Sequence, residues 1–433
     1  MADWIGDVFT SETGWNHLEA LVDIRDRMAG TDGEREAAEA TREILGEYAR
    51  NARFEEFDLQ GWERGSTSIG TPAGEEDGIA LPRSPAGTAA GTLVDMGHGV
   101  PEDFEDVDLE GKIVLVSSDA PDWYDRYVHR REKYYYAMDR GAAGFLYQNH
   151  VEGCLPPTGS VGNEDVPIGE IPAVGISSEV GARLARRFDG EEITLDVEAD
   201  IYDATSQNVH AELGPETDTE VLVTSHVDAH DIAEGAMDNG AGTAMVVELA
   251  KALAQREDEL DTRVHFIVFG AEEVGLVGSA VDARRRDHDT IKAVLNFDGV
   301  VRGRTLSFTT HGFEELADAA ETVTERYDHP AIVKPEQGPH SDHWPYVKWG
   351  VPGIHVMSDT GEDGRGWGHT FADTLDKIEP RNLREQAILL TDVAVELASE
   401  DRELPHADPE VIAGHLEREG LAESMKVMGD WPY

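Results

Sequence analysis

The sequence predicts an α/β fold, in which a mostly parallel sheet forms the middle of three layers and helices cover both of its faces. Over residues 221–399, apolar runs of strand length alternate with longer helical segments, a pattern typical of parallel sheets. The 433 residues also exceed the ~100–200 of an ordinary domain. We therefore expect a smaller, inserted α+β unit in addition to the main domain.

The main domain is expected to begin with residues 1–65. Residues 34–50 place apolar side chains near one helical face, and residues 53–59 favour a strand. A Gly/Pro/Ser-rich stretch at 61–87 then indicates a boundary. Residues 66–201 are expected to form the insert, with strands at 112–117, 144–148, 171–176 and 193–199, a helix leading to Arg140, and a second helix capped by Ser177 or Ser178.

Residues 202–405 are expected to hold the remainder of the main domain. Its predicted strands span 221–225, 264–269, 293–297 and 354–357, and its predicted helices span 242–254, a short segment near Val277, 313–326 and 381–399. Residues 406–433 would form a C-terminal extension with a candidate helix over 409–419.

The composition is strongly acidic, with 88 Asp and Glu against 36 Lys and Arg and a formal charge of −52. The acidic residues are spread along the chain, and only eight of the basic residues are Lys. Such a surface suits a halophilic protein, since molar salt shortens the Debye length to ~3 Å and screens the self-repulsion. An acidic face for a cationic partner is the alternative. Nucleic acid is excluded, because phosphates require a basic surface.

The sequence favours a soluble, cytoplasmic protein. Met1 to Thr10 lack the basic and apolar regions of a secretory signal, and no stretch approaches the ~20 apolar residues of a membrane span. Cys154 is the single cysteine, so an intramolecular disulfide is excluded. The oligomeric state stays open, with a homo-oligomer among the options.

Histidines and carboxylates follow several of the predicted strands. Ligands of open α/β sheets bind just outside the carboxyl ends of the strands, and the residues at these positions or in adjoining loops are His226, Asp228, Asp238, Glu272, Glu273, Asp298 and His369. Taken singly, each is more often ordinary structure than a ligand. Their convergence on one edge makes a metal site and a hydrogen-bonded structural cluster equally plausible from the residues alone.

Five ordered motifs resemble those of the di-zinc aminopeptidase/glutamate carboxypeptidase family. They are SHVD at 225–228, AMDNGAG at 236–242, FGAEEVGLVGS at 269–279, NFD at 296–298 and HTFADTLDK at 369–377, and SDH at 341–343 followed by GVPG at 350–353 is also similar. The order and the gaps match over roughly residues 30–60 and 202–400. The resemblance implies a zinc exopeptidase fold and a peptide substrate.

By this resemblance, His226 and Asp298 would hold one Zn²⁺, and Glu273 and His369 would hold the other, with Asp238 bridging the two ions. Co²⁺ or Mn²⁺ could replace zinc in vitro. Nitrogen and carboxylate ligands suit zinc, and two ions ~3.5–4 Å apart can supply a bridging hydroxide that attacks a peptide carbonyl. Glu272 would be the general base.

The family pattern also gives Asp228 the role of orienting His226 from outside the coordination sphere. One departure is Gly368, which stands where several family members carry a Tyr that supports the oxyanion. Trp367, Tyr346 and His343 are the candidates to replace it, and ordinary packing is the alternative for each.

The insert resembles the protease-associated domain of some of these peptidases, through DLEGKIVLV at 108–116 and RGAAGFLY at 140–147. It contains no evident catalytic set. The run Tyr134–Tyr136 is expected to be packing.

Within the peptidases, an aminopeptidase is favoured over a carboxypeptidase or dipeptidase. A carboxypeptidase needs a cation for the terminal carboxylate, and Arg365, Arg302 and Arg304 are candidates for which surface solvation is the alternative. A non-enzymatic scaffold and a glutaminyl-cyclase-like acyltransferase are further alternatives. Both are disfavoured because all five ligand positions are retained.

Overall fold

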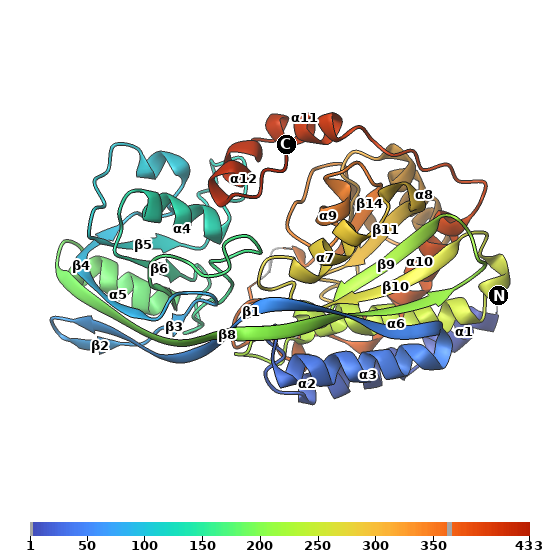
Figure 1. The fold of residues 1–433 in the computed structure, drawn as a ribbon, viewed down its shortest axis with the longest axis horizontal. Coiled ribbons are helices and arrows are strands. Elements are labelled where there is room, and N and C mark those ends of the chain that lie inside the picture. The colour runs from blue at the N-terminus through green and yellow to red at the C-terminus, as the bar shows by residue number, and fades with distance from the viewer. Residues whose placement is uncertain (1–2, 362–365) are drawn as a thin grey trace. The chain divides into compact units, whose positions relative to one another are not determined.

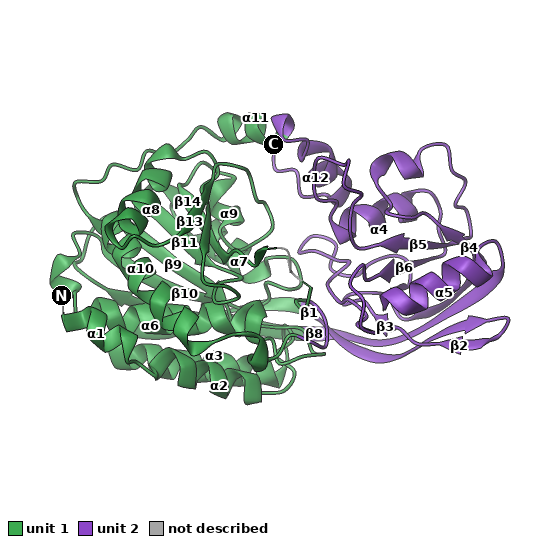
Figure 2. Cartoon of the chain, turned by 180° about the vertical axis from the view of Figure 1, so that it is seen from behind, with its two compact units in different colours: residues 1–59, 204–368, 373–416 green, residues 60–203, 369–372, 417–433 purple. Residues whose placement is uncertain are grey.

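The computed structural model describes residues 3–361 and 366–433. The chain forms two compact units (Figure 2). Unit 1 comprises residues up to 59 together with 204–368 and 373–416, and unit 2 comprises 60–203, 369–372 and 417–433. The boundaries predicted at residues 66 and 201 stay predictions.

The centre of unit 1 is a parallel sheet of four strands in the order β14, β11, β9, β10. They span Gly353–Ser358 (β14), Ile291–Phe297 (β11), Glu220–His226 (β9) and Arg263–Phe269 (β10). β12 (Leu306–Thr309) pairs antiparallel with β14 and parallel with β13 (Ala331–Lys334), and β8 (Glu192–Leu213) pairs antiparallel with β10. Every residue of β9 is buried, as expected of a strand covered on both faces.

Helices cover both faces of this sheet (Figure 1). On one face, α6 (Ala241–Ala254) and α10 (Pro380–Ala398) contact the central strands. Outside them pack α1 (Asp3–Phe9), α2 (Thr13–Asp23), α3 (Asp32–Tyr48) and α8 (Glu314–Arg326). On the other face, α7 (Val277–Arg285) and α9 (Trp344–Val347) bury Ala283 and Tyr346 against Leu222 and Ile267. The predicted layered α/β architecture is confirmed.

Unit 2 contains the parallel strands β4 (Gly87–Asp95), β5 (Ile113–Ser117), β6 (Gly144–Gln148) and β7 (Ala173–Ile176). β8 and β3 (Ile79–Ala80) pair antiparallel at the two ends of this row. The helices α4 (Arg130–Asp139) and α5 (Ser178–Phe188) accompany these strands, and the Ser177 hydroxyl caps α5. Tyr134 and Tyr135 are buried in its core, as the packing interpretation predicts.

The strand predicted over residues 53–59 is longer than expected and continues into the Gly/Pro/Ser-rich stretch. β1 runs from Arg50 to Thr71 and pairs with β8 and with β2 (Gly74–Glu76). At Gly65, an added Cβ would lie 2.7 Å from the backbone oxygen of Glu198 on β8. The glycine therefore allows close approach of two backbones and does not break the strand.

The C-terminal extension contains two helices, α11 (Pro409–Arg418) and α12 (Ala422–Met428). The first confirms the candidate helix over 409–419. The second was not expected, and within unit 2 it packs on α4. There Arg131 of α4 donates to the carboxylate of Asp430 at 2.9 Å.

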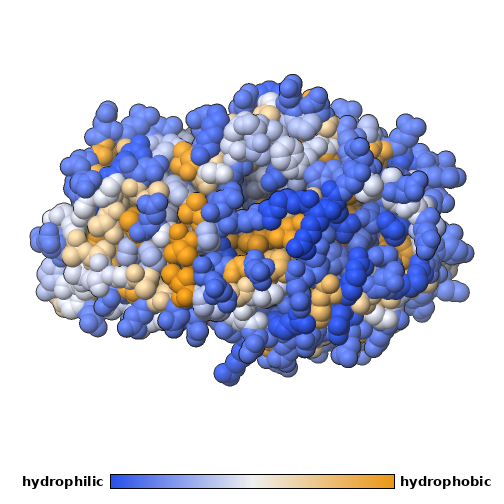
Figure 3. All heavy atoms as spheres, in the orientation of Figure 1, coloured by the Kyte–Doolittle hydropathy of each residue, from blue (hydrophilic) through white to orange (hydrophobic). Residues whose placement is uncertain are grey.

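The exposed surface is strongly hydrophilic over most of the face drawn in Figure 3. Among the described residues, no helix combines the length and the apolar character needed to cross a membrane.

Candidate metal centre

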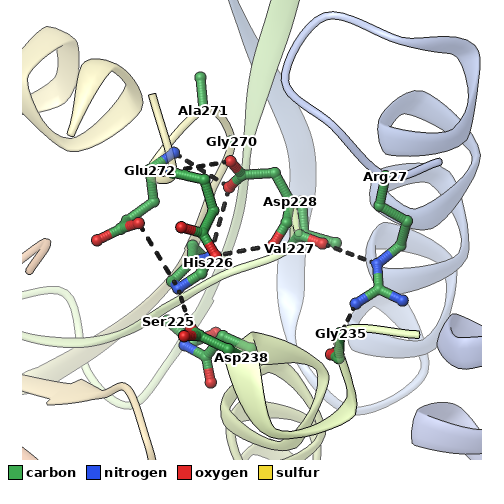
Figure 4. A network of polar contacts seen from close by, with 12 residues as sticks. Arg27, Ser225, His226, Val227, Asp228, Gly235, Asp238, Gly270, Ala271 and Glu272 are labelled. Carbon is green, nitrogen blue, oxygen red and sulfur yellow. Dashed lines mark hydrogen bonds and ion pairs between the residues drawn. The ribbon is translucent and has the colours of Figure 1, made fainter. Parts of the chain in front are cut away.

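His226, the last residue of β9, is fully buried and lies among three carboxylates, of which Figure 4 labels those of Asp238 and Glu272. Its Nε2 atom is 3.6 Å from Asp238 Oδ1, 3.9 Å from Glu272 Oε2 and 4.0 Å from Asp298 Oδ1. Among the described residues this nitrogen has no hydrogen-bond partner. Ligands that share one zinc at ~2.0–2.2 Å lie about 3–4 Å apart, so the spacing fits a common metal ion.

The other ring nitrogen of His226 fixes the imidazole. Nδ1 lies 3.1 Å from the backbone oxygen of Asp228 and 3.4 Å from its Oδ1 atom. Nδ1–H therefore donates towards Asp228, which leaves Nε2 facing the three carboxylates. This is the tautomer that a metal-binding histidine requires.

Asp228 also holds the two adjacent glutamates. Its Oδ1 accepts the backbone N–H of Glu272 and its Oδ2 accepts that of Glu273, both at 3.1 Å. Ala271, just before them, has a left-handed backbone (φ 58°), and its N–H donates to Glu34 Oε1 at 2.9 Å. The turn after β10 is thus fixed by two buried carboxylates.

Glu34 comes from α3 and is itself unusual. Burial, followed by repulsion from Asp228, raises the pKa of Glu34 to about 8, although its carboxylate accepts from Gly30, Ser206 and Ala271. A second buried carboxyl group therefore lies beneath the turn, and its raised pKa favours the protonated form near neutral pH.

Asp238 is placed by the turn Ala236–Gly240 before α6. Asp373 accepts the backbone N–H groups of Met237 at 2.7 Å and Asp238 at 3.1 Å. Burial raises the pKa of Asp373 to about 7, and Asp238 raises it further. The guanidinium of Arg302 lies 3.6 Å from Asp238 Oδ2.

The loop between β9 and this turn is held by the buried Arg27 (Figure 4). Its guanidinium donates to the carbonyl oxygens of Val227, Glu234 and Gly235 at 3.2, 2.8 and 2.9 Å. Gly235 has a left-handed backbone (φ 58°), and a Cβ there would lie 2.4 Å from the Ala229 Cβ. Only glycine fits this position without strain.

Asp298 follows β11 and is oriented by a chain of buried polar side chains. Ser341 Oγ donates to Asp298 Oδ2 at 2.8 Å, Asn296 Nδ2 donates to Ser341 Oγ at 2.9 Å, and Thr224 Oγ1 donates to Asn296 Oδ1 at 2.7 Å. The SDH motif at 341–343 therefore contributes Ser341 to the site.

The electrostatics of the cluster favour a cation. Burial raises the pKa of Glu272 well above its ordinary value, despite the nearby His226, and raises that of Asp342 to about 8. Several buried carboxyl groups share a small volume around one imidazole, and a divalent ion would neutralise this charge. Imidazole nitrogen with carboxylate oxygens is a donor set that zinc takes, so the residues fit the metal that the motifs imply.

His369 lies in the short piece 369–372 of unit 2, and its carbonyl accepts the N–H of Thr158 at 2.8 Å. Arg365 is outside the described residues. Trp367 is exposed, with the ammonium of Lys377 5.5 Å from its ring.

Tyr346 and His343 make hydrogen bonds and ring contacts with residues outside the proposed metal ligands. The Tyr346 hydroxyl donates to Asp282 at 2.5 Å. The His343 ring stacks between those of His311 and His355 at 4.6 and 4.9 Å, and its Nε2 donates to the carbonyl of Gly338 at 2.9 Å.

Sequence reasoning missed His230, whose Nε2 is 2.9 Å from Glu273 Oε2. A signal was present, because His226, Asp228 and His230 alternate after a strand and alternate residues point to one side. It also missed Asp373 and Glu34, whose roles depend on backbone N–H groups that no side-chain pattern reveals.

The fold and the strand-end cluster of imidazole and carboxylates define a metal-dependent hydrolase. Comparison with known proteins agrees. Residues 208–394 match the model of peptidase family M28, and residues 88–184 match the PA domain. Together these matches indicate a metallopeptidase that carries an inserted PA domain.

Individual relatives span most of the chain. Aminopeptidase YwaD of Bacillus subtilis is 26% identical over 91% of this chain and 86% of its own. Carboxypeptidase Q of Bos taurus is 24% identical over 91% and 87%. The structure of BSAP, a zinc aminopeptidase from Bacillus subtilis, superposes with a TM-score of 0.70 at 25% identity, covering 90% of this chain and 96% of that one.

Proposed function

We propose that this chain is an aminopeptidase that works with two zinc ions. One ion would be held by His226 and Asp298 and the other by Glu273 and His369, with Asp238 shared between them. The observation that carries the proposal is the buried His226 Nε2, which has no hydrogen-bond partner among the described residues and faces three carboxylates at 3.6–4.0 Å. The zinc named for the similar Bacillus subtilis aminopeptidase supports the choice of metal.

When bound, the ions supply a hydroxide nucleophile near neutral pH and polarise the scissile carbonyl. Glu272 takes the proton of the attacking water and delivers it to the leaving amine. Burial raises the pKa of Glu272 in the metal-free protein, so this carboxyl group is suited to carry a proton. Asp228 keeps Glu272 and the His226 imidazole in place through the bonds described above.

An aminopeptidase is favoured over a carboxypeptidase because of the site's charge. A free ammonium group is attracted by the surplus of buried carboxyl groups, whereas a terminal carboxylate is repelled. Of the candidate cations, Arg304 is exposed and binds Glu385, while Arg302 faces Asp238 and donates to the carbonyl of Met237. Neither guanidinium is directed at an incoming carboxylate.

A carboxypeptidase is the second candidate. The similarity to Carboxypeptidase Q over 91% of the chain supports it. Its distinguishing requirement is a cation that binds the substrate's terminal carboxylate. Replacement of Arg302 would then raise KM for substrates with a free carboxyl terminus and leave amidated substrates unaffected.

The experiment that tests the proposal is metal removal in molar KCl. We expect the purified protein to contain two Zn²⁺ per chain, to lose peptide hydrolysis after chelation, and to regain it with Zn²⁺ or Co²⁺. Titration of the metal-free protein should restore activity only as the second equivalent binds. Unimpaired hydrolysis by rigorously metal-free protein would refute the proposal.

A further inference from the structure

His230 and Glu273 form a buried pair that the motifs above do not explain. Nε2 of His230 lies 2.9 Å from Oε2 of Glu273, and the two side chains are 5% and 4% exposed. Glu273 has a proposed role as a metal ligand, whereas no role is assigned to His230.

The backbone on both sides of this pair is firmly held. The N–H of Ala229, next to His230, donates to the carbonyl of Arg27 at 3.0 Å, and the N–H of Glu273 donates to Asp228 at 3.1 Å. β9 and β10 are parallel neighbours, so the two loops start at the same edge of the sheet. Little ordering is therefore required of these side chains when an ion binds.

A second buried histidine–glutamate pair shows how such a contact is satisfied without a metal. Nδ1 of His265 lies 3.1 Å from Glu220 Oε2, and the Glu220 carboxylate also binds the guanidinium groups of Arg263 and Arg286. That pair belongs to an ion-pair network. His230 instead lies in the loop between β9 and the turn Ala236–Gly240, at the edge of the sheet where the proposed metal ligands lie.

We propose that His230 is a protein ligand, through Nε2, of the metal ion that Glu273 holds. The inference rests on the proposed two-metal function. It makes the two positions unequal, because the ion at Glu273 would have imidazoles from His230 and His369 and the other ion would have only His226. An additional neutral nitrogen ligand strengthens zinc binding, so the ion at Glu273 should be the last to leave on dialysis.

The test counts coordinated imidazoles in the cobalt-substituted protein by proton NMR. Each imidazole bound through Nε2 gives one solvent-exchangeable, strongly shifted Nδ1–H signal. We expect His230→Gln to lose one such signal relative to wild type, and His265→Gln, the matched control from the other pair, to lose none. An unchanged number of signals in His230→Gln at full cobalt loading would overturn the proposal.

A second measurement separates a ligand from an outer partner of Glu273 and does not depend on the first variant. In His230→Ala, we expect the affinity for one of the two Zn²⁺ ions to fall by more than the ~10–100-fold that loss of an outer partner costs. His230→Asp, which supplies another ligand oxygen, should recover most of it. Equal weakness of the Asp and Ala variants would contradict ligation.

Neither measurement records hydrolysis. Absence of aminopeptidase activity would therefore not affect the evidence that His230 is a ligand. An unchanged number of imidazole signals in His230→Gln would likewise not affect the proposal that the protein is a peptidase.

Discussion

At the scale of single residues, the proposed chemistry depends on two adjacent glutamates that one aspartate holds by their backbone N–H groups. The Asp228 carboxylate divides its two oxygens between Glu272 and Glu273. Successive side chains then leave the turn in different directions. Glu273 can therefore bind metal while Glu272 transfers protons as the general base. The proposed difference in their roles is a consequence of this turn.

The residue that tests this division is Glu272. We expect Glu272→Gln to keep both metal ions and to lose at least ~10²-fold in kcat, the usual contribution of a general base. Metal content and steady-state kinetics are the measurements, with the exposed Glu39→Gln as control. Because Glu272 Oε2 lies only 3.9 Å from His226 Nε2, loss of metal from Glu272→Gln would instead make Glu272 a ligand, and unchanged turnover would remove it from the mechanism.

At the scale of elements, helix α2 packs on the core with a buried, uncharged histidine. His17 Nε2 lies 3.1 Å from Thr41 Oγ1 on α3, and that hydroxyl donates to the carbonyl of Ala37. Thr41 therefore accepts the hydrogen bond, and Nε2 of His17 carries the proton. Burial, and secondly Arg27, lowers the pKa of His17 to about 4.

This shift has a definite sign in the pH dependence of stability. The unfolded chain binds a proton at His17 near pH 6.5 and the folded chain only near 4, so the contribution of His17 is present above pH 6.5 and is lost as pH falls towards 4. The loss amounts to about 3 kcal/mol. We expect His17→Gln, which keeps a donor for Thr41, to flatten denaturant-derived unfolding free energies of metal-free protein between pH 6.5 and 4. A slope equal to that of wild type would contradict this.

The elements that carry the site are the ones that sequence patterns predict well. β9, β10 and β11 are mainly apolar runs. His226 is the last residue of β9, Asp298 follows β11 directly, and Glu272 lies in the turn after β10. The features that the sequence did not predict have a common physical cause, because each depends on contacts between distant parts of the chain. Gly65 in β1 signals a turn in isolation, yet it is required by the approach of β8, and only the partner strand reveals this.

The same limit applies within the site. Asp373 acts on the backbone of Met237 and Asp238 from more than a hundred positions away in the chain. Its role follows from tertiary placement, which no local pattern in the sequence encodes. His230 could have been identified by its alternation with His226 and Asp228, but a lone histidine in a loop has many ordinary explanations.

At the scale of the whole molecule, the formal charge of −52 predicts a strong response to salt. Self-repulsion destabilises the compact state, and the Debye length falls from ~10 Å at 0.1 M to ~3 Å at 1 M. We expect Tm to rise steeply with KCl up to about 1 M and more slowly beyond. Thermal unfolding at several KCl concentrations measures this, with equal osmolality of sucrose as the uncharged control. A Tm that is independent of KCl would contradict the halophilic interpretation.

The central claim is that the zinc-loaded chain removes residues from the free amino end of peptides. The direct measurement is a matched panel of dipeptides with free, N-acetylated and C-amidated ends, assayed at high KCl with and without zinc. We predict zinc-dependent cleavage of the free and C-amidated substrates and at least about tenfold lower kcat/KM for the N-acetylated ones, a difference of ~1.4 kcal/mol. Cleavage of N-acetylated substrates with loss of activity on C-amidated ones would contradict the account and assign a carboxypeptidase.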